Sequence, residues 1–158
     1  MIILGVDPGY GRCGYGVIEV VKRKVSVLDF GCIEPEVKID TQFKLEKVYD
    51  GLTKIAEQFK PDILAVEKIF FFKNAKTVVS VGAAIGVVKL MGVKNNLVIE
   101  EYTPLQIKVA LTGYGKADKK QVQQMVKLVC KLDQIPQPDD AADGLAVAYT
   151  AGVYNKFI

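Results

Sequence analysis

Histidine and tryptophan are absent from this chain of 158 residues, and cysteine occurs only three times. Without histidine, the chain cannot use a Ser-His-Asp or Cys-His nucleophile or a zinc site built on imidazole. Cys13, Cys32 and Cys130 are an odd number and lack metal-ligand spacing, so we expect reduced, mostly buried thiols in a cytoplasmic protein. Any hydrolytic chemistry therefore depends on carboxylates, lysines and an oxygen-preferring metal.

Long apolar runs are also lacking. The longest weakly charged stretch, residues 77–88, is flanked by lysines and is shorter than the roughly 20 residues that a membrane-spanning helix needs. We recognise no signal peptide and expect no association with membranes. Half of the residues are hydrophobic and a quarter are charged, which is typical of a globular protein, and the length suits one domain over residues 1–158.

The small net charge of +3 is unevenly distributed. Residues 73–138 carry ten lysines against four acidic residues, a net charge of +6. A basic middle between two segments that carry acids indicates a polyanion-binding surface, although solvated helix faces produce the same pattern. Because lysine contacts phosphate as a point charge, the composition favours recognition of a nucleic-acid backbone over the reading of bases.

Two short apolar stretches each end in a carboxylate. Residues 2–6 contain β-branched side chains, which predicts a buried strand, and Asp7 follows directly before a Pro-Gly turn. Residues 62–67 repeat this pattern and end in Glu67. An acid at a strand end lies on a rigid support and can serve as a metal ligand, although many such acids are only solvated turn residues.

The remaining pattern predicts an α/β chain. We expect two strands that form a meander with the first one, then helices and strands in alternation. In order these are strands 15–21 and 25–33, helix 45–59, strand 62–67, helix 74–91, strand 97–101, helix 104–111, and helices that begin at Asp118 and Pro138. Asp118 and Gln121 predict a capping box, and Asp40 or Thr41 is expected to cap the first helix.

Residues 9–14 formally match the dinucleotide-binding pattern G-x-G-x-x-G. That motif needs a helix to begin at its glycines, whereas residues 15–21 have the pattern of a strand. We therefore interpret these glycines as part of a hairpin and not as a nucleotide site.

Asp140 and Asp143 lie three residues apart at the start of the last helix, so they share one face and repel each other. A cation between them would remove this cost. Singly, each has a structural explanation as an acid near a helix start. Together with Asp7 and Glu67, they predict an all-oxygen site for two divalent metal ions that act in phosphodiester hydrolysis.

Helix 74–91 contains Gly82 and Gly86, each of which costs about 1 kcal/mol relative to alanine. With the nearby Ala83 and Ala84, they predict a smooth side that another helix or subunit approaches closely. We expect this face to lie at a homodimer interface.

The order of the elements and five groups of residues resemble the RuvC family of bacterial Holliday junction resolvases, which have a ribonuclease H-like fold. The matching residues are Val6-Asp7-Pro8-Gly9 with Gly14-Tyr15-Gly16, Ala65-Val66-Glu67 with Phe70 and Lys73-Asn74, Gln106-Ile107-Lys108, Lys119 to Val122 with Met125-Val126, and Asp140 to Ala146. The resemblance covers essentially the whole chain. It implies an α/β fold with a five-stranded mixed sheet, whose first three strands are an antiparallel meander, flanked by helices on both faces.

The resemblance also implies a homodimeric endonuclease that makes symmetric paired nicks in four-way DNA junctions during recombination and repair. It implies two Mg²⁺ ions per active site, for which Mn²⁺ can substitute, held by Asp7, Glu67, Asp140 and Asp143. The RuvA and RuvB branch-migration proteins are candidate partners.

Two lysines and one aromatic residue match further functional positions of the family. Lys108 and Lys119 are expected beside the scissile phosphate, and Phe70 on an unpaired base at the crossover, although a core position for Phe70 is the alternative. The other expected DNA-binding residues are Lys73, Lys76, Lys116 and Lys120. Which of Lys116, Lys119 and Lys120 lies nearest the phosphate stays open.

Three other functions are compatible with parts of the sequence. Another ribonuclease H-like nuclease would share the acids without selecting branched DNA. A non-catalytic junction-binding module would not need all four acids and would show no Mg²⁺-dependent nicking. Half of an actin-like ATPase would share the glycine turn after the first strand, but the chain is too short for the second lobe.

Overall fold

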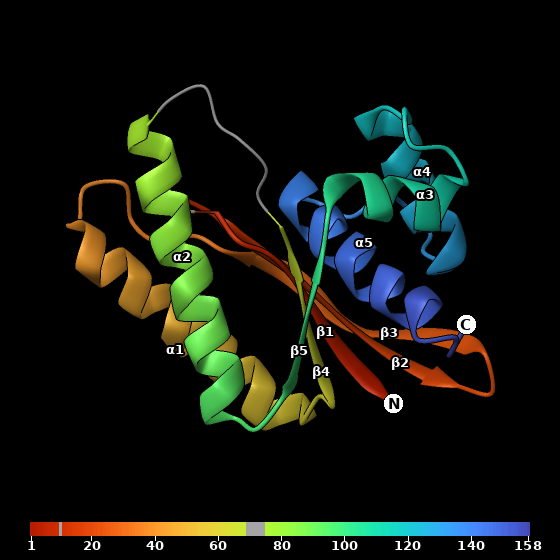
Figure 1. Cartoon of the computed structure of the whole chain (residues 1–158), viewed down its shortest axis with the longest axis horizontal. Coiled ribbons are helices and arrows are strands. Elements are labelled where there is room, and N and C mark those ends of the chain that lie inside the picture. The colour runs from red at the N-terminus through yellow and green to blue at the C-terminus, as the bar shows by residue number, and fades with distance from the viewer. Residues whose placement is uncertain (10, 69–74) are drawn as a thin grey trace.

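The computed structural model describes residues 1–9, 11–68 and 75–158. Within these residues, five strands form one sheet with the order β3-β2-β1-β4-β5 (Figure 1). The strands are β1 (Ile2–Asp7), β2 (Cys13–Val21), β3 (Lys24–Ile33), β4 (Ile63–Glu67) and β5 (Val98–Tyr102).

The sheet is mixed. β1, β2 and β3 form an antiparallel meander, whereas β4 runs parallel to β1, and β5 runs parallel to β4. The predicted five-stranded sheet with its leading meander is therefore confirmed. Because β1 and β4 are parallel neighbours, their last residues lie at the same edge of the sheet.

Helices cover both faces of the sheet (Figure 1). On one face lie α1 (Thr41–Phe59) and α2 (Ala75–Lys94), and on the other lie α3 (Pro104–Thr112), α4 (Lys119–Val129) and α5 (Asp139–Tyr154). The capping box of α4 is present as predicted, since Asp118 accepts from the Gln121 amide and Gln121 accepts from the Asp118 amide. Asp40 occupies the N-cap position of α1, but its side chain makes no capping hydrogen bond.

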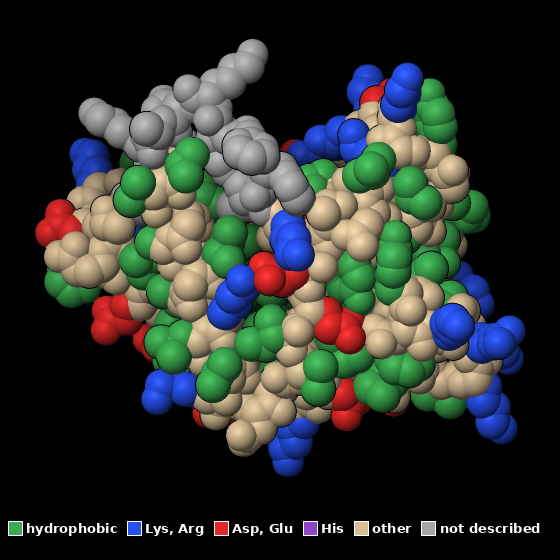
Figure 2. Space-filling view, in the orientation of Figure 1, with side chains coloured by type: hydrophobic (Ala, Val, Ile, Leu, Met, Phe, Trp, Pro, Cys, Tyr) green, Lys and Arg blue, Asp and Glu red, His purple; other side chains and the backbone are tan. Residues whose placement is uncertain are grey.

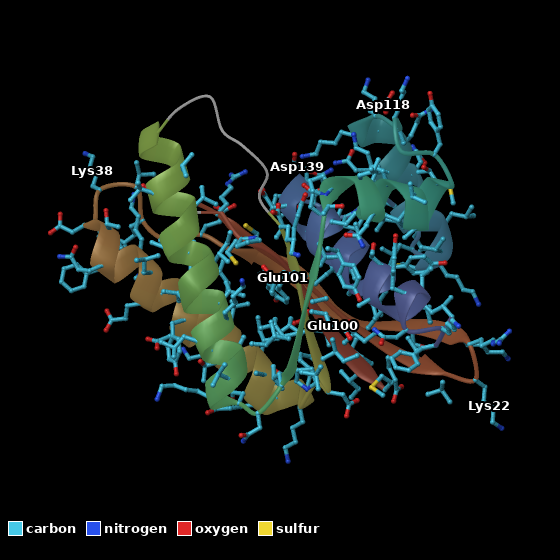
Figure 3. The ribbon with its side chains drawn as sticks, viewed as in Figure 1. Lys22, Lys38, Glu100, Glu101, Asp118 and Asp139 are labelled. Atoms are coloured by element: carbon cyan, nitrogen blue, oxygen red, sulfur yellow. The ribbon has the colours of Figure 1, made fainter. Side chains whose placement is uncertain are left out.

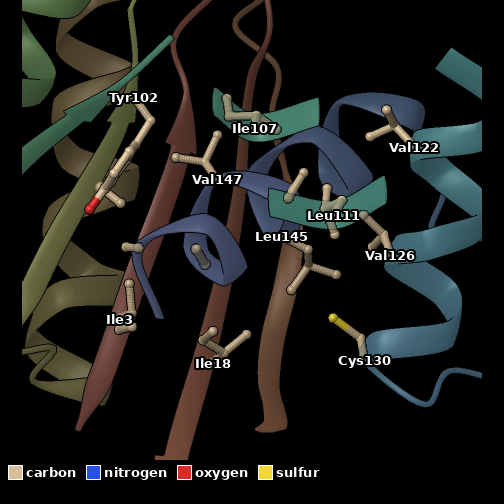
Figure 4. Close-up of a cluster of buried hydrophobic side chains, with 14 of the residues drawn as sticks. Ile3, Ile18, Tyr102, Ile107, Leu111, Val122, Val126, Cys130, Leu145 and Val147 are labelled. Carbon is tan, nitrogen blue, oxygen red and sulfur yellow. The ribbon is translucent and has the colours of Figure 1, made fainter. Parts of the chain in front are cut away.

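The core has two parts because successive side chains of a strand point to opposite faces. Leu4, Val6, Leu64 and Val66 pack beneath α1 and α2. Ile3, Ile18, Ile63 and Ala65 pack on the other face against the remaining helices, where Leu145 of α5 and Val126 of α4 join the same cluster (Figure 4).

α5 lies directly on the central strands because glycines remove side chains from the contact. A Cβ atom on Gly14 of β2 would overlap the carbonyl oxygen of Asp140, and one on Gly16 would overlap the backbone of Leu145. From the helix side, a Cβ atom on Gly144 would overlap the backbone of Tyr15. The first turn of α5 is therefore held against the sheet by contact between backbones.

α2 turns one side to the core and leaves the opposite side open. Val81, Ala84, Val88 and Met91 are buried, so the prediction that Ala84 shares one smooth, closely approached side with Gly82 and Gly86 is wrong. Gly82 and Gly86 are exposed, and nothing lies within 4 Å of a Cβ atom added to either of them.

Among the described helices, none combines the length and the apolar character that a bilayer-crossing segment needs.

Candidate active site

Asp7 and Glu67 meet at one edge of the sheet. Asp7 is the last residue of β1 and Glu67 is the last residue of β4, and the two strands are paired in parallel from Ile3 and Ile63 to Val6 and Val66. The apolar strands thus deliver two carboxyl groups side by side on a rigid support, as the sequence predicts.

The first turns of α5 bring Asp140 and Asp143 to the same place. The contact of Gly14 with the Asp140 backbone fixes this end of the helix over β2, directly beside β1. The charges of Asp140 and Asp143 both act on Asp7, and that of Asp143 also acts on Glu67. All four predicted acids are therefore gathered at one end of the sheet.

The electrostatics of Asp7 and Glu67 are those of a crowded acidic site. Burial, and then the charges of Asp143 and Asp140, raise the pKa of Asp7. Burial, and then the charges of Asp7 and Asp143, raise the pKa of Glu67. A hydrogen bond between the two carboxyl groups lowers the pKa of Asp7 and raises that of Glu67. The carboxylates of the site therefore raise one another's pKa, as like charges do when they are held close together.

Lys119 is in direct contact with one of these acids. Its Nζ atom lies 3.2 Å from Oδ2 of Asp143 and 2.5 Å from Oδ2 of Asp139. The hydrogen bond with Asp139 is the largest cause that raises the pKa of Lys119, and the same contact lowers the pKa of Asp139. Burial raises the pKa of Asp143 against the opposing charge of Lys119.

Arg12 is a second cation at the site and pairs with Asp140, as Lys119 pairs with Asp143. Its guanidinium group lies 3.5 Å from Oδ2 of Asp140 and 3.2 Å from Oε1 of Glu34. Sequence reasoning missed both Arg12 and Asp139 as neighbours of the site. Asp139 had a visible signal, because it directly precedes Asp140, but an acid at a helix start is explained by the helix dipole alone.

A cleft of about 220 Å³ opens beside the acids. Glu67 and Asp143 contribute carboxylates to its wall, and Lys108 and Lys119 contribute ammonium groups. The apolar part of its lining comes from Pro104, Ile107, Val122 and Ala146. The two lysines expected beside a phosphate therefore share one cleft with two of the acids.

The other predicted DNA-binding residues do not line this cleft or are not among the residues that the structure describes. Lys116 and Lys120 are exposed and are not part of the cleft wall. In Figure 2, basic side chains, drawn in blue, lie at the corner formed by α3 and α4, at the upper right. Phe70 and Lys73 fall outside the described residues, as does the side chain of Lys76.

The four acids fit a divalent metal ion by their chemistry. They are oxygen donors without nitrogen or sulfur, which suits Mg²⁺ or Mn²⁺, and their mutual repulsion is what a cation would relieve. Among the described residues, no three acidic or cysteine side chains already converge as ligands of one point. Asp143 is paired with Lys119, Asp140 with Arg12, and Glu67 with Asp7.

This strand order, with helices on both faces and acids at the ends of the first and fourth strands, defines the class of ribonuclease H-like proteins. The family model described as crossover junction endodeoxyribonuclease RuvC matches residues 3–151. A protein of that name from Fusobacterium nucleatum is 49% identical over 150 residues, which are 95% of this chain and 79% of that protein. One from Thermosipho melanesiensis is 45% identical over 157 residues, which are 99% of this chain and 100% of that protein.

Solved structures agree with these relatives. The Thermus thermophilus RuvC structure superposes with a TM-score of 0.91 at 29% identity and covers 99% of this chain and 96% of that one. The same protein in complex with a Holliday junction substrate gives a TM-score of 0.94 at 29% identity, with 99% and 95% coverage. The chain belongs to the RuvC family of crossover junction endodeoxyribonucleases, which confirms the resemblance seen in the sequence.

Proposed function

We propose that the protein is an endonuclease that resolves four-way DNA junctions by symmetric paired nicks in recombination and repair. The observation that carries the proposal is the gathering of four carboxylates beside a cleft lined by lysines, in a chain of the RuvC family. Support for the substrate comes from the Thermus thermophilus relative, which is described in complex with a Holliday junction.

Asp7, Glu67, Asp140 and Asp143 would hold two Mg²⁺ ions, for which Mn²⁺ can substitute. Bound there, such ions lower the pKa of a water and stabilise both the attacking and the leaving oxygen of the phosphodiester. The chain supplies two of the ligands from strand ends and two from a helix anchored on glycines, so all four have rigid supports. Ions bound there would replace the hydrogen bond between Glu67 and Asp7.

Lys108 and Lys119, which line the same cleft as Glu67 and Asp143, would act on the phosphate. Lys119 is held charged by its acidic partners, since its pKa is raised, and a fixed ammonium group can stabilise the charge that develops on the transferred phosphoryl group. Lys108 lines the same cleft and would contact the backbone next to the scissile bond.

Contacts to the rest of the junction would come from the basic segment. Lys116 and Lys120 are exposed at the start of α4 and the loop before it, where they can reach phosphates beyond the cleft. For Lys73, Lys76 and Phe70 the support is the sequence alone, in which a stacking aromatic residue follows the strand that ends in Glu67.

Two nicks at symmetric positions require two active sites, so we propose a homodimer. The exposed side of α2 supports this, because Val79, Leu90 and Val93 are exposed there together with Gly82 and Gly86, and an apolar stripe of this kind marks a contact surface. RuvA and RuvB remain proposed partners.

The test compares wild type with Asp7→Asn on a synthetic four-way junction, with and without Mg²⁺. We expect Mg²⁺-dependent paired nicks by wild type and a loss of cleavage of at least about 100-fold in the variant, because one ligand of the metal site is gone. Junction binding in a gel-shift assay should survive, because the lysine surface is intact.

Linear duplex and an RNA–DNA hybrid serve as control substrates. Equal cleavage of all three substrates would identify a ribonuclease H-like nuclease without junction selectivity. Binding of the junction without any Mg²⁺-dependent nicking by wild type would identify a non-catalytic binding module.

A further inference from the structure

Lys119 has two carboxylate partners of different kinds. Asp143 belongs to the acidic set proposed to hold metal, whereas Asp139 precedes this set at the start of α5 and its charge helps to raise the pKa of Asp143. The shorter contact is with Asp139, at 2.5 Å against 3.2 Å. Figure 3 shows Asp139 at the start of α5, away from Asp118 at the start of α4. The ammonium group is thus shared between a proposed ligand and a residue just outside the ligand set.

This sharing matters when a metal ion takes Asp143. An ammonium group whose sole partner is Asp143 competes with the ion for the same oxygen atoms. A second partner next to the site gives the ammonium group a place to stay once Asp143 is occupied. Lys119 also lines the cleft. Paired with Asp139, its ammonium group would stay within reach of a phosphate bound in the cleft.

We infer that Asp139 is a positioning residue that holds the Lys119 ammonium group at the rim of the cleft and thereby leaves Asp143 to the metal ion. The inference rests on the proposed function, in which Asp143 is a metal ligand and Lys119 faces the scissile phosphate. Asp139 itself touches neither ion nor DNA in this role and acts through Lys119 alone.

Stability does not account for the contact. The side chains of Lys119 and Asp139 are 54% and 46% exposed, and ion pairs this exposed contribute little to the free energy of unfolding. Lys119 also lies in the first turn of α4, where the helix dipole disfavours a cation. The competing explanation is that Asp139 is simply an acid at the start of α5, where the dipole favours it.

A double-mutant cycle separates the two explanations. Asp139→Ala is made in the wild-type background and in a Lys119→Met background, and Mg²⁺ and Mn²⁺ binding are measured by calorimetry. In the wild-type background we expect affinity to fall about tenfold, the low end for partners of metal ligands. In the Lys119→Met background we expect less than about a twofold change, because no ammonium group is left to compete.

Junction cleavage gives the second readout. Asp139→Ala should lower kcat at saturating Mg²⁺ about tenfold while the KM for the junction stays within about twofold, because Lys119 is misplaced at the reacting phosphate but DNA is bound elsewhere. Asp139→Glu should restore most of the activity, since it keeps a carboxylate within reach of Lys119.

Glu57→Gln is the matched control. It removes one negative charge from an exposed position beside Lys60 and Pro61, at the opposite edge of the sheet, and should change neither metal binding nor kcat. All variants are compared by thermal unfolding.

Equal loss of metal affinity from Asp139→Ala in both backgrounds would overturn the inference and leave Asp139 as a helix-end acid or a general source of negative charge. Tighter junction binding with unchanged kcat would overturn it as well. If wild type cleaves no junction, the proposed function fails, but the calorimetric cycle still decides whether Lys119 and Asp139 act as a pair.

Discussion

At the scale of single residues, the site depends on the glycine beneath the first turn of α5. A Cβ atom on Gly14 would overlap the Asp140 carbonyl oxygen. We expect Gly14→Ala to lower the free energy of unfolding by about 1–3 kcal/mol, as overpacking does, and to reduce cleavage because Asp140 moves. Thermal unfolding and the junction assay measure both effects. Gly11→Ala is the control, since nothing lies within 4 Å of its added Cβ atom, and an equal effect of the two changes would contradict the packing argument.

The four acids could be predicted from the sequence because each follows a local rule. Asp7 and Glu67 end apolar stretches, and Asp140 and Asp143 share a helix face. The partners Arg12 and Glu34 could not, because their contact joins two loops at the sheet edge through side-chain geometry. A local pattern carries no information on which cation approaches which acid.

At the scale of secondary-structure elements, apolar periodicity predicted the helices and strands to within a few residues. The strand predicted at 97–101 is Val98–Tyr102, and the helix predicted at 74–91 is Ala75–Lys94. Strand pairing is a different matter, since β4 pairs with β1 although β2, β3 and α1, within residues 8–62, separate them in the chain. The meander could be predicted from periodicity and the mixed five-stranded sheet from the family resemblance, whereas the pairing of β4 with β1 is seen only in the structure.

The prediction at this scale concerns the oligomeric state, which we expect to depend on the exposed side of α2. We expect wild type to sediment as a dimer at micromolar concentration and Gly86→Arg to sediment as a monomer, because a long charged side chain would enter a close helix contact. Val21→Arg is the control, since Val21 is 52% exposed at the end of β2 and should leave the dimer intact. A monomeric wild type would contradict the proposed interface.

At the scale of the whole molecule, the acidic site couples stability to pH. The pKa values of Asp7 and Glu67 are raised in the folded chain, so the folded state binds more protons than the unfolded state above the ordinary carboxyl pKa of about 4. The stability from these protons is complete below that pH and is lost as the pH rises through the raised values. Without metal, the protein should therefore become less stable from weakly acidic to weakly basic pH.

Asp7→Asn tests this coupling, because the amide can donate a hydrogen bond to Glu67 without holding a charge. In metal-free buffer near pH 8, we expect the variant to gain about 0.5–2 kcal/mol of stability over wild type, at roughly 2–4 °C of melting temperature per kcal/mol for a chain of this size. Near pH 4 the gain should vanish, since Asp7 and Glu67 are then protonated in wild type. Added Mg²⁺ should stabilise wild type at pH 8 and leave the variant almost unchanged, because ligand binding stabilises only the state that binds it. If the variant is instead less stable than wild type at pH 8, the carboxyl groups of Asp7 and Glu67 do not repel each other. In that case this end of the sheet does not favour the binding of a cation.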